Sequence, residues 1–311
     1  MKQDMPESHP DNLENQNYRL GQRLAIAGLI ISAGLAFIKL TGGILSRSAS
    51  LSADGMESAG DVFTSMVVWG GMAIARRPAD SRYPYGYGRA EALAGKTVGT
   101  ILLMSAVLLI THSVHRLNGP SINLPSWTLW PLALSFILKG VLASIKFRTG
   151  RKIRSSSLVA DSGNDAVDML SALVAAIAII LNLIDHERFA YADPIGALGV
   201  ALIIFIMGLK IFRETSRELM DSQPRPEVLE QVRAVAAGIP HVLDVEKCYA
   251  RKSGTQFFFD LHIEVDPNMT VHDAHGLSHH VKDVILAECD FVKDVLIHIE
   301  PHENNEESSP T

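Results

Sequence analysis

Two stretches of this 311-residue chain, SLSADGMESAGD (50–61) and SLVADSGNDAVD (157–168), decide how the rest of the sequence is interpreted. They align without a gap at an offset of 107 residues: each begins Ser-Leu, continues with Ala-Asp and ends in Asp. Both open long apolar segments that we expect to be antiparallel helices. Internal repeats of this kind are typical of secondary transporters. We therefore expect equivalent side chains to meet near the middle of a membrane.

The polar residues of the repeat are spaced to share one helix face. Glu57 and Asp61 are four residues apart, as are Asn164 and Asp168, and residues i and i+4 lie on the same side of a helix. Carboxylates inside a membrane are costly and usually functional. The alternative is that these acids only join helices by hydrogen bonds, but Ser or Thr would supply such bonds at a lower energetic cost. The four oxygen-bearing side chains predict a cation cage.

Other charged residues in the same segments leave alternatives open. Asp54 and Asp161 lie nearer the helix starts, where an N-terminal cap is as good an interpretation as a route for cations into the cage. Asp165 follows Asn164 and faces about 100° away from it. Lys39 and Lys139 also lie inside apolar segments, either as counter-charges or with ammonium groups reaching a membrane interface.

The composition favours a multi-pass membrane protein. Hydrophobic residues make up 47% of the chain and charged residues 20%, which suits neither a soluble enzyme nor a disordered chain. A membrane-spanning helix needs about 20 mostly apolar residues. Six stretches qualify: residues 24–45, 50–75, 91–115, 127–147, 158–184 and 193–212.

The distribution of Lys and Arg predicts the orientation. The tail and the loops on one side carry most of them, whereas the opposite loops hold only Arg47, Arg116 and Arg188. Positive loops stay in the cytoplasm, so both termini are expected there, in a cell inner or plasma membrane. The polar N-terminus lacks the apolar core of a signal peptide. The net charge of −6 excludes a strongly basic nucleic-acid binder.

The last ninety or so residues have the pattern of a soluble domain, and Pro224 and Pro226 mark its start. Residues 255–266 alternate between apolar and polar, as in a half-buried strand. The predicted elements, in αββαβ order, are a helix at 227–237, strands at 243–252 and 255–266, a helix at 270–288 and a strand at 294–300. This order predicts a two-layer α/β sandwich. Cys248 and Cys289, without CxxC spacing, are expected to be reduced structural thiols.

These motifs together resemble the cation diffusion facilitator family. The resemblance is carried by the paired AD-x-x-(ligand)-x-x-x-D segments, by RYPYGYGRAEALAG (82–95), by DLHIEVDPNMTVHDAH (260–275) and by VLIHIEP (295–301). It implies a homodimeric antiporter that exports divalent metal cations from the cytosol in exchange for protons. It also implies a ferredoxin-like, metal-regulated dimerisation domain at the C-terminus. The metal is then substrate and regulatory ligand, and no other cofactor is expected.

The expected organisation is an α-helical membrane protein with six transmembrane helices and a cytoplasmic α+β ferredoxin-like domain. The expected boundaries are a flexible tail at 1–20, the membrane domain at 21–215, the cytoplasmic domain at 222–302 and a disordered tail at 303–311. The resemblance implies a transport site of Glu57, Asp61, Asn164 and Asp168. It implies cytoplasmic metal ligands at Glu246, His262, His275, His298 and Glu300, with Glu246 in place of a His. It maps a charged interlock below the membrane to Arg89 and Asp221.

Departures from the family pattern bear on the metal. Zinc-moving members commonly have His at one or both positions occupied here by Glu57 and Asn164, and the loop often has His where this chain has Tyr83 and Tyr87. Oxygen ligands favour Mn²⁺ or Fe²⁺, whereas imidazole suits Zn²⁺. Efflux of Zn²⁺, Co²⁺ or Cd²⁺ and a non-transporting metal sensor or scaffold remain the alternatives. An enzyme is disfavoured because the sequence has no HExxH motif and no P-loop.

Overall fold

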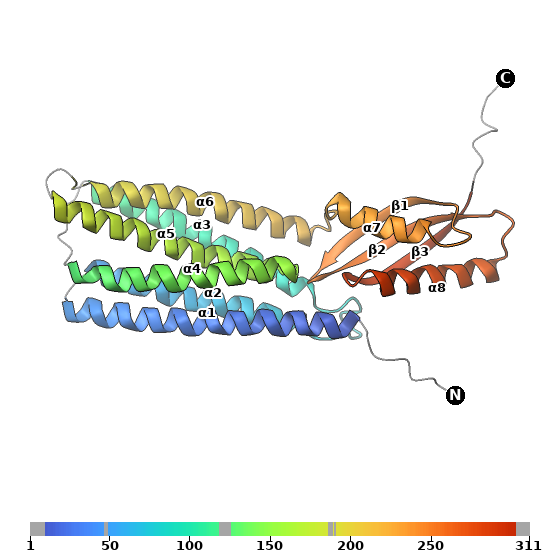
Figure 1. The fold of residues 1–311 in the computed structure, drawn as a ribbon, viewed down its shortest axis with the longest axis horizontal. Helices are drawn as coiled ribbons and strands as arrows, with labels where there is room; N and C mark the ends of the chain where they lie inside the picture. The colour runs from blue at the N-terminus through green and yellow to red at the C-terminus, as the bar shows by residue number, and fades with distance from the viewer. Residues whose placement is uncertain (1–9, 47–48, 118–125, 186–188, 190, 303–311) are drawn as a thin grey trace, which may run out of the picture. The chain divides into compact units, whose positions relative to one another are not determined.

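The structure, a computed structural model, describes residues 10–46, 49–117, 126–185, 189 and 191–302 (Figure 1). It divides into two compact units, one of residues 18–216 and one that contains residues 217–311, and each is described by itself. The first unit is built from long helices. These are α1 (Pro10–Ser46), α2 (Ala49–Ala75), α3 (Arg89–Leu117), the 3-10 turn η1 (Ser126–Thr128), α4 (Leu129–Lys152), α5 (Ser156–Ile184) and α6 (Ala192–Leu219).

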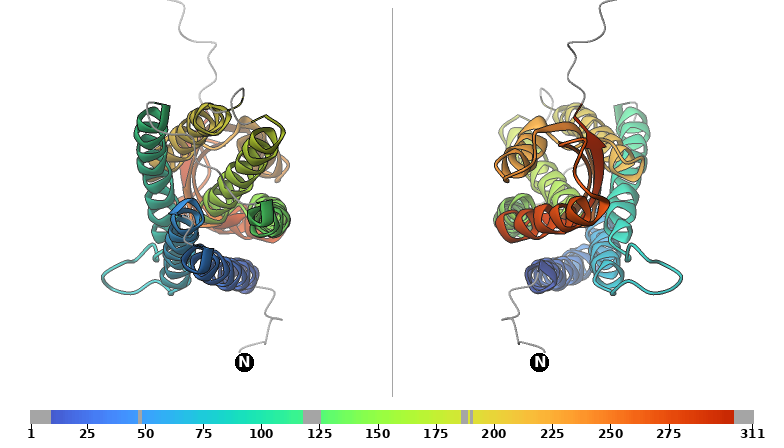
Figure 2. Two further views of the ribbon diagram at one scale, coloured as in Figure 1. Left: turned by 90° about the vertical axis from the view of Figure 1, so that its left-hand side faces the viewer. Right: turned by 90° about the vertical axis from the view of Figure 1, so that its right-hand side faces the viewer.

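The helices of the first unit lie lengthwise side by side, as Figure 1 and the end-on views of Figure 2 show. Helix α5 packs against α2, α3 and α4, so the two repeat segments are neighbours. Residues 153–155 join α4 to α5. In this tight turn Arg154 has a φ of 57°, and the Ser155 side chain accepts a hydrogen bond from the Leu158 N–H as the cap of α5.

The outward surface of the bundle is apolar, as expected for contact with lipid. Phe37, Leu108 and Trp130 are 70%, 67% and 79% exposed. Four segments are long and apolar enough to cross a membrane: Gln16–Gly42, Arg89–His115, Leu129–Lys152 and Pro194–Leu219. Helices α2 and α5 do not meet this criterion within the described residues, although α2 has a shorter apolar segment at Gly60–Ala75. These two helices carry the acids of the repeat. For them the predicted membrane span stays a prediction.

The C-terminal unit has the predicted αββαβ order. Its elements are α7 (Pro226–Ala237), β1 (Asp244–Ser253), β2 (Gln256–Val265), α8 (Val271–Glu288) and β3 (Val292–Pro301). The sheet order is β1-β2-β3, with β1 antiparallel and β3 parallel to β2. Alternate residues of β2, such as Phe259, Leu261 and Ile263, enter one core with residues of both helices. The opposite side of the same strand carries His262. Cys248 and Cys289 are buried free thiols, as predicted.

The N-terminal boundary differs from the prediction. Residues 10–20, expected to belong to a flexible tail, are the first turns of α1. Proline is well tolerated in the first turn of a helix, where its missing N–H leaves no hydrogen bond unmade, and acidic residues near a helix start are favoured by the helix dipole. Pro10, Asp11 and Glu14 supply this pattern. Residues 1–9 and the predicted tail at 303–311 lie outside the described residues.

Candidate metal sites

The predicted cation cage is a buried cluster between α2, α4 and α5, and a lysine lies within it. Lys139 of α4 has no exposed side-chain surface. Its Nζ lies 2.7 Å from Asp168 Oδ2, 3.0 Å from Asp165 Oδ1 and 3.1 Å from Asp61 Oδ2. It also donates to Ser32 Oγ of α1 at 2.9 Å. Lys139 is therefore a counter-charge of the cage, which decides between the two interpretations left open by the sequence.

Three of the four predicted transport ligands converge at this point. Asn164 donates through Nδ2 to Asp61 Oδ1 at 3.0 Å, and Asp168 shares Lys139 with Asp61. The amide oxygen of Asn164 is thereby left for another partner. Glu57 and Asp54 lie in α2, but their side chains lie outside the described residues, so their predicted roles stay predictions.

A second buried lysine extends the cluster along α4 and α5. Lys146 Nζ lies 2.6 Å from Asp161 Oδ2 and 2.6 Å from Asp165 Oδ2. Asp165 therefore bridges Lys139 and Lys146 through its two oxygens. Asp161 is 1% exposed and pairs with Lys146, and Ser155 caps α5 in its place. The capping interpretation of Asp161 is wrong, because the helix begins five residues earlier.

Helix α1 closes the cluster through a glycine. A Cβ on Gly28 would lie 2.4 Å from Lys146 Nζ and 3.3 Å from Ser65 Oγ. Real Cβ atoms do not approach other atoms so closely, so a side chain at this position would displace the ammonium group from its place. The absence of a side chain at residue 28 lets α1 cover the ion pairs of Lys146.

The described cluster is not neutral. Among the described residues, four carboxyl groups (Asp61, Asp161, Asp165, Asp168) face two ammonium groups (Lys139, Lys146), so their formal charges sum to two negative. Buried ion pairs need their partners, since removing one partner typically costs about 3–5 kcal/mol. Sequence reasoning missed Lys146 and the bridging role of Asp165. The available signal was spacing along the sequence. Lys139 and Lys146 are seven residues apart, and Asp161 and Asp165 are four residues apart, so each pair shares a helix face.

Lys39, the other intramembrane lysine, lies elsewhere. Its Nζ donates to Ser58 Oγ of α2 at 3.0 Å, and Lys39 is 3% exposed. It is buried among helices, so the interpretation that its ammonium reaches the membrane interface is wrong.

The loop between α2 and α3 holds its tyrosines by hydrogen bonds of its own. Asp80 accepts from the Tyr87 hydroxyl at 2.8 Å and from the backbone N–H groups of Arg82 and Tyr83. The bond from Tyr87 is the main cause that lowers the pKa of the Asp80 carboxyl. The positions where the family often has His thus serve here to close the loop.

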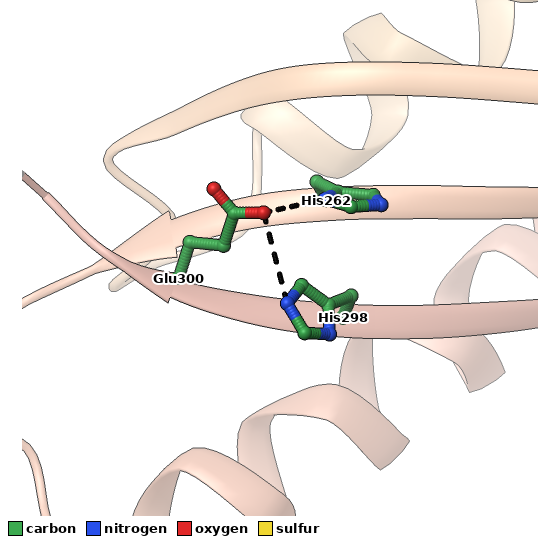
Figure 3. Close-up of side chains that lie close together, drawn as sticks. All are labelled: His262, His298 and Glu300. Atoms are coloured by element: carbon green, nitrogen blue, oxygen red, sulfur yellow. Dashed lines mark hydrogen bonds and ion pairs between the residues drawn. The ribbon is translucent and has the colours of Figure 1, made fainter.

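The cytoplasmic unit carries a separate cluster on the polar side of its sheet. His262 on β2 and His298 and Glu300 on β3 turn their side chains toward one another (Figure 3), and their ligand atoms lie within 4.8 Å of one another. Glu300 Oε1 lies 2.5 Å from His262 Nδ1 and 3.7 Å from His298 Nε2. The parallel register, which pairs His262 with His298, places the rings together. Two imidazole nitrogens and a carboxylate suit a transition-metal ion.

A bulge brings a fourth predicted ligand to this cluster. Val245 pairs with Ile263 and Lys247 with His262, so Glu246 is the extra residue of a β-bulge. A side-chain hydrogen bond with Glu246, followed by one with His262, lowers the pKa of the Glu300 carboxyl from its ordinary 4.5 to about 2. The ionised form of Glu300, which a metal ligand needs, is thereby favoured.

The remaining predicted residues do not join these clusters in the described part of the chain. His275 on α8 packs its ring edge-on against His279, with centroids 4.6 Å apart, and is not among the three converging ligands. Arg89 begins α3, and Asp221 follows α6 with a φ of 56°. They belong to different units, so the interlock stays a prediction.

Comparison with known proteins gives the same assignment along nearly the whole chain. The model described as the cation efflux transmembrane domain matches residues 25–220, and that of the cation efflux protein cytoplasmic domain matches residues 224–302. The manganese efflux system protein MneP of Bacillus subtilis is 30% identical over 283 residues, covering 89% of this chain and 93% of MneP. The magnetosome protein MamB of Paramagnetospirillum magneticum is 28% identical over 260 residues, covering 83% and 87%.

Among solved structures, a variant of MamM-CTD is 26% identical and covers 25% of this chain and 96% of its own, with a TM-score of 0.24. The two family models lie end to end on the two units, the membrane helices and the small α/β domain. The chain thus belongs to the cation diffusion facilitators, a family of cation efflux transporters rather than enzymes.

Proposed function

We propose that this chain is a homodimeric antiporter of the cell membrane that exports Mn²⁺ or Fe²⁺ from the cytosol in exchange for protons. Glu57, Asp61, Asn164 and Asp168 are its transport ligands. The observation that carries the proposal is the convergence of Asp61 and Asp168, from α2 and α5, on one buried cation, the ammonium of Lys139, with Asn164 donating to Asp61. Intramembrane acids held in such a cluster mark ion pathways.

The chemistry of the donors supports the choice of metal. Asp61 contacts the amide of Asn164 and the ammonium of Lys139, and Lys139 in turn contacts the hydroxyl of Ser32 and the carboxylate of Asp168. Oxygen donors suit Mn²⁺ and Fe²⁺ better than they suit softer ions, although affinity rises toward Zn²⁺ along the first-row series. MneP, which is similar over most of its length, is named as a manganese efflux protein.

Proton exchange is supported by the need for an energy source. The sequence has no P-loop, which disfavours direct ATP coupling, so an ion gradient drives export. Metal binding to ionisable ligands is generally accompanied by proton release. We further infer that both termini are cytoplasmic. We also infer that the cytoplasmic domain pairs two protomers and responds to metal bound by His262, His298, Glu300 and Glu246.

Uptake into inverted membrane vesicles tests this function. Vesicles containing the chain are given Mn²⁺, Fe²⁺, Zn²⁺, Co²⁺ or Cd²⁺, with and without an acidic interior. We expect Mn²⁺ or Fe²⁺ to be accumulated fastest and the acidic interior to accelerate uptake. Preferred uptake of Zn²⁺ would overturn the metal assignment, and indifference to the pH gradient would leave a uniporter. No uptake of any metal would favour a sensor or scaffold.

A further inference from the structure

The ammonium of Lys139 occupies the position that a transported cation needs. An ammonium group has three N–H donors, and four oxygens surround Lys139 Nζ at 2.7–3.1 Å. Two of them, Oδ2 of Asp61 and Oδ2 of Asp168, belong to predicted transport ligands. Divalent ions bind oxygens at about 2.0–2.6 Å. An ion held by both Oδ2 atoms would therefore overlap with Nζ. The ammonium group and a metal ion cannot occupy this position at the same time, because they repel and are too close.

We propose that Lys139 is a tethered counter-ion that occupies the cation site in the metal-free chain and is displaced by the arriving metal. The proposal rests on the proposed function for the assignment of Asp61 and Asp168 as transport ligands. Lys139 then acts as a positioning and specificity-determining residue. It keeps the carboxylates of α2 and α5 together when the site holds no metal, and it competes with every cation that enters.

Asp165 can remain the partner of the Lys139 ammonium after a metal ion has displaced it from Asp61 and Asp168. Its Oδ1 lies 3.0 Å from Lys139 Nζ, while its Oδ2 lies 2.6 Å from Lys146 Nζ. Asp165 is not among the predicted ligands, and on α5 it lies one turn from Asp168. Lys139 can therefore release Asp61 and Asp168 and keep its contact with Asp165. Lys146, held at the same time by Asp161, anchors Asp165 in place.

Charge gives this exchange its selectivity. A monovalent cation that replaces the ammonium brings no additional charge to the two carboxylates, so it gains little over Lys139 itself. A divalent cation brings one charge more, and the described cluster has four carboxyl groups for two ammonium groups. Attraction between charges is strong where water is excluded. The tethered lysine thus rejects monovalent ions, while divalent ions displace it.

Metal rescue of a lysine variant tests the exchange. The full chain in lipid nanodiscs is compared with Lys139→Met, of similar length but without charge, and with Lys146→Met as the matched control. Thermal unfolding is measured with and without Mn²⁺. Mn²⁺ binding to the site is taken as the total binding minus the binding that remains when Asp61→Ala is introduced. We expect the melting temperature of metal-free Lys139→Met to lie below that of the wild type, and Mn²⁺ to restore this melting temperature. Mn²⁺ should bind to Lys139→Met at least tenfold more tightly than to the wild type. Mn²⁺ should not restore Lys146→Met.

Ser32→Ala keeps the test decisive if Lys139→Met does not fold. It removes one acceptor of the Lys139 ammonium and no carboxylate, so Mn²⁺ should bind about tenfold more tightly, at the lower end of the range expected for a hydrogen bond to a charged group. Unchanged or weaker Mn²⁺ binding in the variant that folds would overturn the exchange and leave Lys139 a fixed structural ion pair. Vesicle uptake by the wild type is scored separately. A chain that binds Mn²⁺ but does not transport it contradicts the proposed function, and the binding comparison still decides the exchange.

Discussion

The two candidate metal sites of this chain lie in opposite surroundings. In the membrane unit the candidate ligands are buried oxygens, and two lysines without exposed side-chain surface compensate part of their charge. In the cytoplasmic unit the cluster contains two imidazoles, and the His298 side chain is 62% exposed. A buried set of carboxylates cannot be left without counter-charge, whereas water stabilises an exposed set. The lysines of the membrane site are therefore buried with their partners, whereas Lys247 at the sheet site, 2.9 Å from Glu246 and 3.9 Å from Glu300, has a side chain that is 40% exposed.

The difference teaches which site is suited to movement and which to sensing. Exchange of one internal cation for another keeps the charge in the membrane low as an ion passes. An open cluster of imidazole and carboxylate ligands on a rigid sheet can respond to the metal level without passing the ion on. The predictions below test this division, beginning with the largest expected effect.

Removal of a single cage carboxylate should abolish transport, whereas removal of a sheet ligand should not. We expect Asp61→Ala and Asp168→Ala each to lower metal uptake by at least about 100-fold, because even outer-shell partners of a metal cost 10–100-fold. Glu300→Ala should leave uptake within a few-fold of the wild type. Vesicle uptake at equal protein level measures this. Glu91→Gln, which alters another buried acid of the membrane unit outside the cage, is the control, and near-normal uptake by Asp168→Ala would show that the cage is misplaced.

Addition of an imidazole to the membrane site should make it resemble the sheet site. Asn164→His introduces a nitrogen donor beside Asp61, so the uptake ratio of Zn²⁺ to Mn²⁺ should rise by about tenfold, equivalent to 1.4 kcal/mol. Uptake should also become more sensitive to pH, because imidazole titrates near neutrality. Competition between the two metals in vesicles measures the ratio. If the ratio is unchanged, residue 164 does not bind the transported ion.

A methyl group beside Lys146 should disturb the buried cluster. Gly28→Ala places a Cβ 2.4 Å from Lys146 Nζ, and overpacking typically costs about 1–3 kcal/mol. Thermal unfolding in nanodiscs should report a lower melting temperature. Gly34→Ala on the same helix is the matched control, because no atom lies within 4 Å of its Cβ position, and it should be neutral or slightly stabilising. Equal stability of the two variants would mean that α1 does not cover the ion pairs.

The smallest effect concerns the exposed Glu300. Its folded-state pKa, about 2, is below its ordinary 4.5, so its ionised form stabilises the fold above about pH 4.5 and loses this contribution as the pH falls toward 2. The melting temperature of Glu300→Gln should lie below that of the wild type by no more than about 2 °C at pH 6. The difference should shrink between pH 4.5 and pH 2. Glu288→Gln, at the end of α8, is the control, and a difference that does not depend on pH would contradict the ion-pair origin.

Much of the fold could be predicted from sequence because local patterns determine it. The period-two alternation of residues 255–266 predicted β2 to within one residue at each end, and the apolar runs predicted the helices. The N-terminal tail was misjudged because its polar residues were interpreted as disorder, although Pro10 and the acids behind it form a normal helix start.

The site was only partly predictable because charge compensation depends on tertiary packing. The repeat identified Asp61, Asn164 and Asp168, whose convergence needs only that α2 and α5 pack together. The role of Lys139 could not be settled from a single segment, since a lysine in an apolar run either pairs or reaches the interface. The two lysines of α4 meet the acids of α5 because the short turn at residues 153–155 folds one helix back on the other.

The parallel pairing of β3 with β2 has a consequence for how the protein is made. β2 is the middle strand, and its second partner is the last described strand, Val292–Pro301, which arrives only through the crossover of α8. During synthesis all the membrane helices have left the ribosome while β2 still has an unpaired edge. Unpaired edges invite association with other chains. A nascent chain is therefore most vulnerable before β3 emerges, and a truncation before residue 292 would leave β2 as the exposed edge of a two-stranded sheet.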